Sequence, residues 1–173
     1  LASVEAFAAI ASSVPEAHLC IVGDHQDSGY VDQIRQTVAR AGLVKRVHLL
    51  GFRDDMPLIM RGADVLVHTT IDEAQGRVIL EAQAAEVPVV AYGGGGLDES
   101  VCSGQTALVV PFGDLEGLAG ALTQLACNRH VREAMGRQGR LWVEPRFTAR
   151  QTAQRVHEIL ESILDGRLDS RSS

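Results

Sequence analysis

Aromatic residues are scarce in this chain of 173 residues, and acidic residues outnumber basic ones. Aromatics amount to 4%, so stacking platforms for single-stranded nucleic acid or flat sugar faces are not expected as the main binding device. The formal net charge of −6 argues against a general nucleic-acid binder, because phosphate neutralisation needs a basic face. No apolar run approaches the ~18 residues that would indicate a membrane span.

Cysteine is also rare, and its spacing excludes two classes of stabilised fold. Cys20, Cys102 and Cys127 are odd in number and contain no C-x-x-C pair, so neither a disulfide framework nor a zinc cage is indicated. Cys20 lies in a strand-like apolar run and is predicted to be a buried, inert thiol. No signal peptide is evident, which favours a cytoplasmic location.

What the sequence has instead is a regular alternation of strand-like and helical segments. Short apolar runs predict strands at 19–23, 47–51, 65–70, 87–92 and 107–110. Helices are predicted at 3–14, 30–41, 56–62, 76–86, 97–103, 115–127, 130–140 and from 148 onward. This order predicts the α/β class, with parallel β-α-β units in a Rossmann-like, doubly wound sheet covered on both faces.

Several local signals fix the ends of these segments. Gly42 is expected to cap one helix, and Thr148 with Gln151 has the spacing of a capping box. Asp54 and Asp55 are expected to cap the helix that follows them. We expect one domain at 1–164 and a disordered tail at 165–173; the helix at 3–14 has no strand before it, so the chain is expected to begin inside a β-α-β unit.

Familiar catalytic and nucleotide-binding motifs are absent. The sequence has no G-x-G-x-x-G after a strand, no Walker A loop, no G-x-S-x-G elbow and no H-E-x-x-H. The informative stretch is IDEAQGRVILEAQAAEVPVVAY, in which Glu73 lies in a loop and Glu81 lies inside the next helix. The free amides near Gly76, Arg77 and Val78 would form an anion site suited to a diphosphate. Glu81, about 7–8 Å further along the helix axis, could accept hydrogen bonds from a ribose.

This stretch resembles the E-x7-E signature of the retaining glycosyltransferases of family 4, which have the GT-B fold of two facing Rossmann-like domains. The segments VHLLGFRDDMP, ADVLVHTT and VPVVAY…GGLDESVCSGQTALVV resemble further family blocks in the same order. The likeness covers residues 3 to about 160. It implies the C-terminal, donor-binding half of a GT-B fold, truncated at its N-terminus and lacking its first strand.

The resemblance also implies roles for individual residues. Glu73 resembles the catalytic-site glutamate that contacts hydroxyls of the donor sugar, and Glu81 resembles the ribose-binding glutamate. The other positions that resemble donor-binding segments form the diphosphate cradle, the loop beside the base and a glycine pair near the donor: Gly76, Arg77, Val78, Gly51, Phe52, Arg53, Gly95 and Gly96.

The implied activity is hexosyl transfer from a nucleoside-diphosphate sugar to an acceptor hydroxyl, without a cofactor or metal, as in polysaccharide or glycolipid biosynthesis. The acceptor would bind a missing N-terminal domain, so the fragment alone is expected to be inactive, and the full enzyme could associate peripherally with membranes. Two alternatives stay open. One is a sugar-nucleotide epimerase or phosphorylase on the same fold; the other is a non-catalytic nucleotide-binding module, which Gln75 makes plausible because the family usually has Phe there.

Overall fold

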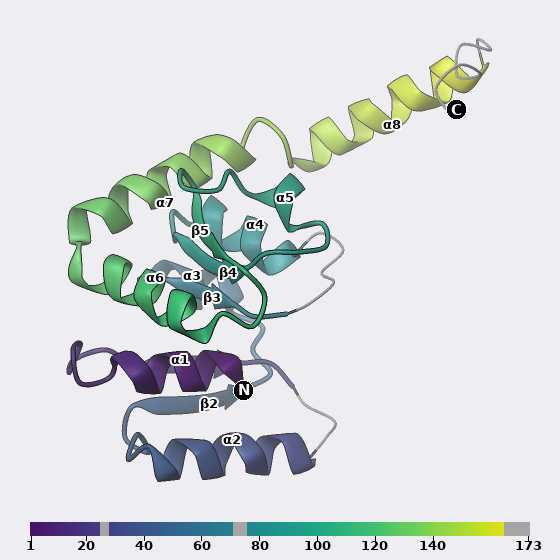
Figure 1. The fold of residues 1–173 in the computed structure, drawn as a ribbon. Coiled ribbons are helices and arrows are strands. Elements are labelled where there is room, and N and C mark those ends of the chain that lie inside the picture. The colour runs from purple at the N-terminus through teal and green to yellow at the C-terminus, as the bar shows by residue number, and fades with distance from the viewer. Residues whose placement is uncertain (25–27, 71–75, 165–173) are drawn as a thin grey trace.

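The computed structural model describes residues 1–24, 28–70 and 76–164 (Figure 1). Helices and strands alternate up to residue 110, as the apolar runs predict, and only helices follow in the described residues. In chain order the elements are α1 (Ala2–Ile10), β1 (Leu19–Val22), α2 (Ser28–Arg40), β2 (Val47–Gly51), α3 (Met56–Gly62), β3 (Leu66–His68), α4 (Arg77–Ala84), β4 (Val89–Tyr92), α5 (Leu97–Ser100), β5 (Ala107–Val110), α6 (Leu115–Cys127), α7 (Arg129–Val143) and α8 (Ala149–Leu164).

The strands pair in parallel and form two sheets. One sheet has the order β1-β2 and the other has the order β3-β4-β5. The predicted α/β class with parallel strands is therefore confirmed. In the residues described, β1 and β3 are not hydrogen-bonded to each other, so the strands form two sheets.

The three-stranded sheet lies between two layers of helices. Along β4, Val89 and Ala91 pack in a core cluster with residues of α3, α4 and α5. Val90 and Tyr92 pack in a second cluster with α1, α6 and α7. Successive side chains of a strand point to opposite faces, so the helices of the two clusters cover opposite faces of this sheet.

The two-stranded sheet is covered by α1 and α2. Leu19 and Ile21 of β1 pack against a core cluster that contains Phe7 of α1 and Ile34 of α2. Cys20 points to the opposite face and is exposed. The prediction of a buried thiol is wrong because helices cover only the face of β1 that carries Leu19 and Ile21.

Two helix ends have the caps that the sequence predicts. Gly42 has φ 69° and the Leu43 N–H donates to the Val38 carbonyl at 2.9 Å, the pattern of a left-handed C-terminal cap. At the start of α8 the Thr148 N–H donates to Oε1 of Gln151 at 3.1 Å, and the Gln151 N–H donates to Oγ1 of Thr148 at 3.3 Å. This reciprocal pair is the predicted capping box.

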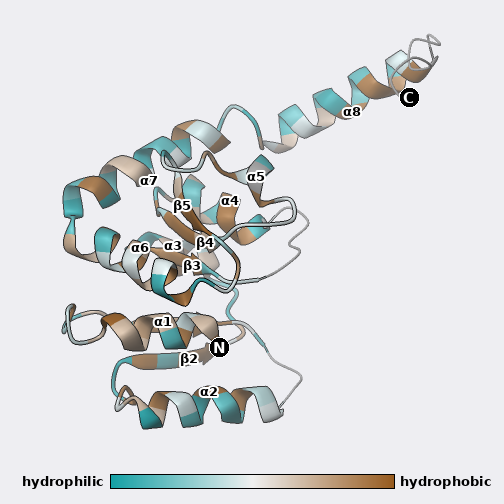
Figure 2. Ribbon diagram, viewed as in Figure 1, coloured by the Kyte–Doolittle hydropathy of each residue, from teal (hydrophilic) through white to brown (hydrophobic). Residues whose placement is uncertain are grey.

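Helix α8 extends away from the rest of the molecule (Figure 1). Apolar residues recur along it among hydrophilic ones (Figure 2). More than half of the surface is exposed for Val156, Ile159, Leu160 and Ile163. Within the described ranges, no helix combines the length and the apolar character needed to cross a bilayer.

Candidate functional site

The start of α4 has the geometry of an anion-binding helix terminus. Gly76 precedes the helix with φ 64° and ψ 58°, a left-handed conformation that glycine adopts without steric cost. The Ile79 N–H donates to the Gly76 carbonyl at 2.8 Å, which leaves the amides of Gly76, Arg77 and Val78 ahead of the first helical hydrogen bond. No side chain of the described residues caps this end. Glu73 lies in 71–75, outside the described residues.

Two charged side chains stand next to this helix start. Arg77 is the first helical residue, and its Nη2 lies 3.6 Å from Oε1 of Glu81 one turn later. Both side chains reach solvent, with 86% of Arg77 and 47% of Glu81 exposed. The structure therefore places a cation and a carboxylate within reach of each other on one side of α4.

A second group of predicted residues follows β2. Gly51 ends that strand with φ 65°, and its carbonyl accepts a hydrogen bond from the Gly23 N–H at 2.9 Å. Phe52 is 76% exposed, which is unusual for a large apolar side chain. An exposed aromatic ring beside a backbone turn is a surface that a planar ligand could cover.

Arg53 in the same loop is held by Asp55 in a bidentate pair. The Nε and Nη2 atoms of Arg53 donate to the two carboxylate oxygens of Asp55 at 2.8 and 2.6 Å. The hydrogen bond raises the pKa of Arg53 further and lowers the pKa of Asp55 below its usual range. Asp55 precedes α3 but makes no side-chain cap, so the capping prediction is wrong for Asp55 because Arg53 takes its carboxylate.

The glycines after β4 form a tight turn into α5. Gly95 has φ 60°, and Gly96 is the residue that precedes Leu97, the first residue of the helix. The Gly93 N–H donates to the Val110 carbonyl at 2.8 Å, which keeps the start of this turn attached to β5. The turn thus leaves the sheet at the carboxyl end of its central strand, where ligands bind in open α/β sheets.

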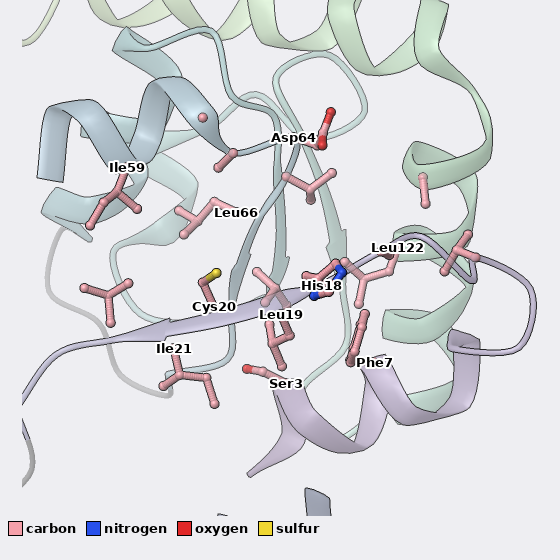
Figure 3. Close-up of a pocket in the computed structure, with 18 of the residues that line it drawn as sticks. Ser3, Phe7, His18, Leu19, Cys20, Ile21, Ile59, Asp64, Leu66 and Leu122 are labelled. Carbon is pink, nitrogen blue, oxygen red and sulfur yellow. The ribbon is translucent and has the colours of Figure 1, made fainter. Parts of the chain in front are cut away.

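A hollow lies near the carboxyl end of β3. Ser3 at the start of α1 lies with its hydroxyl 3.1 Å from that of Thr69, directly after β3. A shallow hollow of about 560 Å³ opens nearby, lined by Thr69, Tyr92 and Phe112 among others. Of the site residues that the sequence predicts and the structure describes, none lines this hollow. Val78 instead lines a larger cavity between β1 and β3 (Figure 3).

Sequence reasoning missed the aromatic pair in this hollow. The ring of Tyr92 meets the ring of Phe112 edge-on, with centroids 5.4 Å apart. Burial is the main cause that raises the pKa of the Tyr92 hydroxyl, and the charges of Asp114 and Glu5 add to it. The position of Tyr92 at the end of a predicted strand was the available signal, since strand ends border ligand crevices in this fold class.

Comparison with known proteins places the chain among glycosyltransferases. The sequence profile of the family described as "Glycosyl transferases group 1" matches residues 2–142. The chain is 27% identical over 149 residues to the lipopolysaccharide core biosynthesis glycosyltransferase LpsE of Rhizobium meliloti, which covers 86% of the chain and 43% of that protein.

Solved structures agree with this family match. The crystal structure of Anabaena Alr3699/HepE in complex with UDP is similar with a TM-score of 0.87 and 30% identity, over 93% of this chain and 44% of that one. The same Anabaena protein is also known in complex with UDP-glucose. The C-terminal domain of the group 1 protein LpcC from Francisella tularensis shares the fold, with a TM-score of 0.79 and 22% identity over 86% of this chain and 78% of that one. The chain spans less than half the length of the Rhizobium and Anabaena proteins.

Proposed function

Since the chain belongs to the group 1 glycosyl transferases and has the fold of the C-terminal Rossmann-like domain of GT-B glycosyltransferases, we propose that it binds the donor in a retaining hexosyltransferase. The donor would be a nucleoside-diphosphate sugar, and the acceptor would be a hydroxyl group bound by a further domain. The alternatives of an epimerase, a phosphorylase or a non-catalytic module receive no comparable support from the family match.

The observation that carries the proposal is the start of α4. An αL glycine precedes the helix, and no side chain of the described residues caps its first turn. A helix start of this kind attracts anions through its free N–H groups and its partial positive charge. Arg77 adds a full positive charge next to it. A diphosphate leaving group would be stabilised there in the transition state without a metal ion.

Glu81 supports a nucleoside next to the diphosphate. Its carboxylate lies one turn inside α4 and is half exposed, so it can accept hydrogen bonds from the two hydroxyls of a ribose. The Arg77 guanidinium lies 3.6 Å from this carboxylate. Glu73 would act on the sugar side of the phosphates, a role that rests on the resemblance of its position.

The loops after β2 and β4 complete the proposed donor site. Phe52 and the backbone of Gly51 would border the base, with Arg53 kept beside them by its pair with Asp55. The Gly95 turn would let the chain pass close to the donor, because no side chain obstructs the approach. The Anabaena relative was solved with UDP and UDP-glucose, which makes these two ligands the first to test.

The proposal is tested by titrating the 173-residue chain with UDP, UDP-glucose, GDP and ADP in a calorimeter, with adenosine as an uncharged control. We expect one of the diphosphates to bind with a 1:1 stoichiometry and adenosine not to bind. Binding should weaken with added salt, because the helix start and Arg77 recognise charge. A chain that binds none of the diphosphates at millimolar concentration would contradict the proposal.

A further inference from the structure

A buried side-chain amide connects helix α4 to helix α5. Gln83 of α4 is completely buried, and its Nε2 atom donates to the Ser100 carbonyl at 2.7 Å. Ser100 is the last residue of α5 and is buried to the same degree. The hydrogen bond therefore joins the inner face of α4 to the end of α5, away from solvent.

The buried face of α4 around Gln83 is otherwise apolar. Its neighbours Ile79 and Ala82 pack in one core cluster with Leu97 of α5. On the side of α7, a Cβ on Gly139 would lie 3.0 Å from Cγ of Gln83, so the lack of a side chain there leaves room for the glutamine. Gln83 is thus enclosed by α4, α5 and α7.

Burial of this amide has a cost that an apolar side chain would not have. The Oε1 atom of Gln83 is buried and has no hydrogen-bond partner among the described residues. An unmatched polar atom in the interior lowers stability, whereas methionine has nearly the same length and no such atom to satisfy. Glutamine supplies instead a bond with a fixed length and direction. Its contribution is therefore to the relative position of α4 and α5 more than to stability.

Helix α5 forms one hydrogen-bonded unit with the glycine turn before it. The Leu97 N–H donates to the Gly94 carbonyl at 3.4 Å, and the Glu99 N–H donates to the Gly96 carbonyl at 3.3 Å. At the other end of the helix, the Val101 N–H donates to the Leu97 carbonyl at 3.1 Å. A shift of the end of α5 is therefore transmitted to the turn.

The glycine turn and the start of α4 belong to the same edge of the sheet. β3 and β4 are parallel neighbours, and the chain runs from the carboxyl end of β3 to α4 and from the carboxyl end of β4 into the turn. The Gly93 N–H attaches the other end of the turn to the Val110 carbonyl of β5. The turn is thus held by the sheet at one end and, through α5, by Gln83 at the other.

Gln83 is placed so that it cannot contact a ligand at this edge. Residues two positions apart in an α-helix point about 200° apart, so Gln83 projects away from Glu81. Glu81 is half exposed, whereas Gln83 has no exposed surface. An effect of Gln83 on ligand binding must therefore pass through the elements that it holds.

We propose that Gln83 is a positioning residue of the donor site: through Ser100 it holds the glycine turn 93–96 at a fixed place relative to the first turn of α4. The inference rests on the proposed function, because both segments are proposed to bind the nucleoside-diphosphate sugar. A turn that is ordered before the donor arrives binds it more tightly, since less conformational entropy is lost on binding.

Hydrogen exchange of the ligand-free chain, resolved by residue with NMR, tests the link to α5. Gln83→Met removes the hydrogen bond and keeps the length of the side chain. Val38→Ala is the control, because it truncates a buried side chain of α2, which covers the other sheet. We expect the Glu99 and Val101 amides to exchange at least about tenfold faster in Gln83→Met, and at the wild-type rate in Val38→Ala. Equal exchange in all three chains would overturn the proposal.

Calorimetric titration with UDP, GDP and ADP separates positioning from a merely structural role. We expect Gln83→Met to bind the diphosphate that the wild type prefers about three- to tenfold more weakly. Val38→Ala should lower Tm through its cavity and keep the wild-type affinity. Equal affinity of Gln83→Met and the wild type would overturn the positioning role and leave the donor proposal intact. A wild type that binds none of the three would overturn the donor proposal, and the positioning role with it.

Discussion

The guanidinium of Arg77 lies 3.6 Å from the carboxylate of Glu81, one turn further along α4. An exposed pair at this spacing contributes well under ~1 kcal/mol to the stability of the fold. Both groups belong to the first five residues of α4, the helix whose start is proposed to bind the diphosphate. The pair is therefore better understood as part of a binding surface than as a stabilising contact.

Replacing Glu81 should remove the recognition of ribose. We expect Glu81→Ala to weaken nucleoside-diphosphate binding about ten- to hundredfold, the effect of losing a hydrogen bond to a charged group. Comparison of UDP with 2′-deoxy-UDP by calorimetry sharpens the test. The wild type should prefer UDP, and Glu81→Ala should bind both equally. Glu116→Ala, which removes an exposed glutamate from the first turn of α6, is the control and should bind as the wild type does.

Gly76 should be needed for the shape of the helix start. Alanine at φ 64° is strained by about 1 kcal/mol or more, and relief of that strain would turn the first-turn amides away from the ligand. Gly42 has nearly the same φ, 69°, and open space where a Cβ would be placed. Gly42→Ala should therefore lower Tm similarly but leave nucleotide affinity unchanged. Equal affinities of the two variants would argue against a ligand at α4.

Helix α7 should tolerate no side chain where it crosses the end of α4. A Cβ on Gly136 would lie 1.9 Å from the Glu86 carbonyl oxygen, so Gly136→Ala forces the helices apart. We expect a loss of about 1–3 kcal/mol in the free energy of unfolding. Gly120→Ala on α6 meets nothing within 4 Å and should instead stabilise by about 0.5–1 kcal/mol, through helix propensity. Urea denaturation of both variants measures whether the free energy of unfolding falls in Gly136→Ala and rises in Gly120→Ala.

Arg46 should stabilise the connection from α1 to β1. Its guanidinium donates to the carbonyls of Ala11, Val14 and Ala17 at 2.8, 2.6 and 2.8 Å. Lysine cannot reach three carbonyls in this fork, so Arg46→Lys should cost about 1.5–3 kcal/mol. Arg129→Lys, in an exposed pair with Glu133, should change stability by less than ~0.5 kcal/mol. A similar cost for both variants in urea denaturation would contradict the role of Arg46.

Tyr92 should make stability fall at high pH. Burial raises its pKa above 10.0, so the folded state keeps the hydroxyl proton after the unfolded chain has lost it. The contribution is fully present below about pH 10 and is lost as pH rises through the folded-state pKa. Tyr92→Phe should flatten this part of the profile of unfolding free energy against pH. An unchanged alkaline slope in Tyr92→Phe would show that another group is responsible.

Local signals in the sequence predicted the elements better than their assembly. The Gly42 cap and the Thr148–Gln151 capping box depend on neighbours within a few residues, and both are confirmed. The exposure of Cys20 could not be predicted, because it depends on which faces and edges of β1 other elements cover. The pairing of the strands into the two groups β1-β2 and β3-β4-β5 likewise depends on contacts between segments far apart in the chain.

The site was predictable only as positions along the chain. The start of α4 after Gly76 was predicted, because a helix start after a strand has a sequence signature. Two side-chain contacts were not predicted: the bidentate pair of Arg53 with Asp55 and the edge-on contact of Tyr92 with Phe112. Each depends on side-chain directions that spacing along the sequence does not specify.

One of the three hydrogen bonds of Arg46 attaches the carboxyl end of α1 to the residue before β2. Ala11 caps the carboxyl end of α1, so that end moves only together with the start of β2. The opposite end of α1 is held by the 3.1 Å contact between the hydroxyls of Ser3 and Thr69 and by the burial of Val4 and Ala6. One helix therefore attaches the segment before β2 to the segment after β3, so α1 bridges the two sheets.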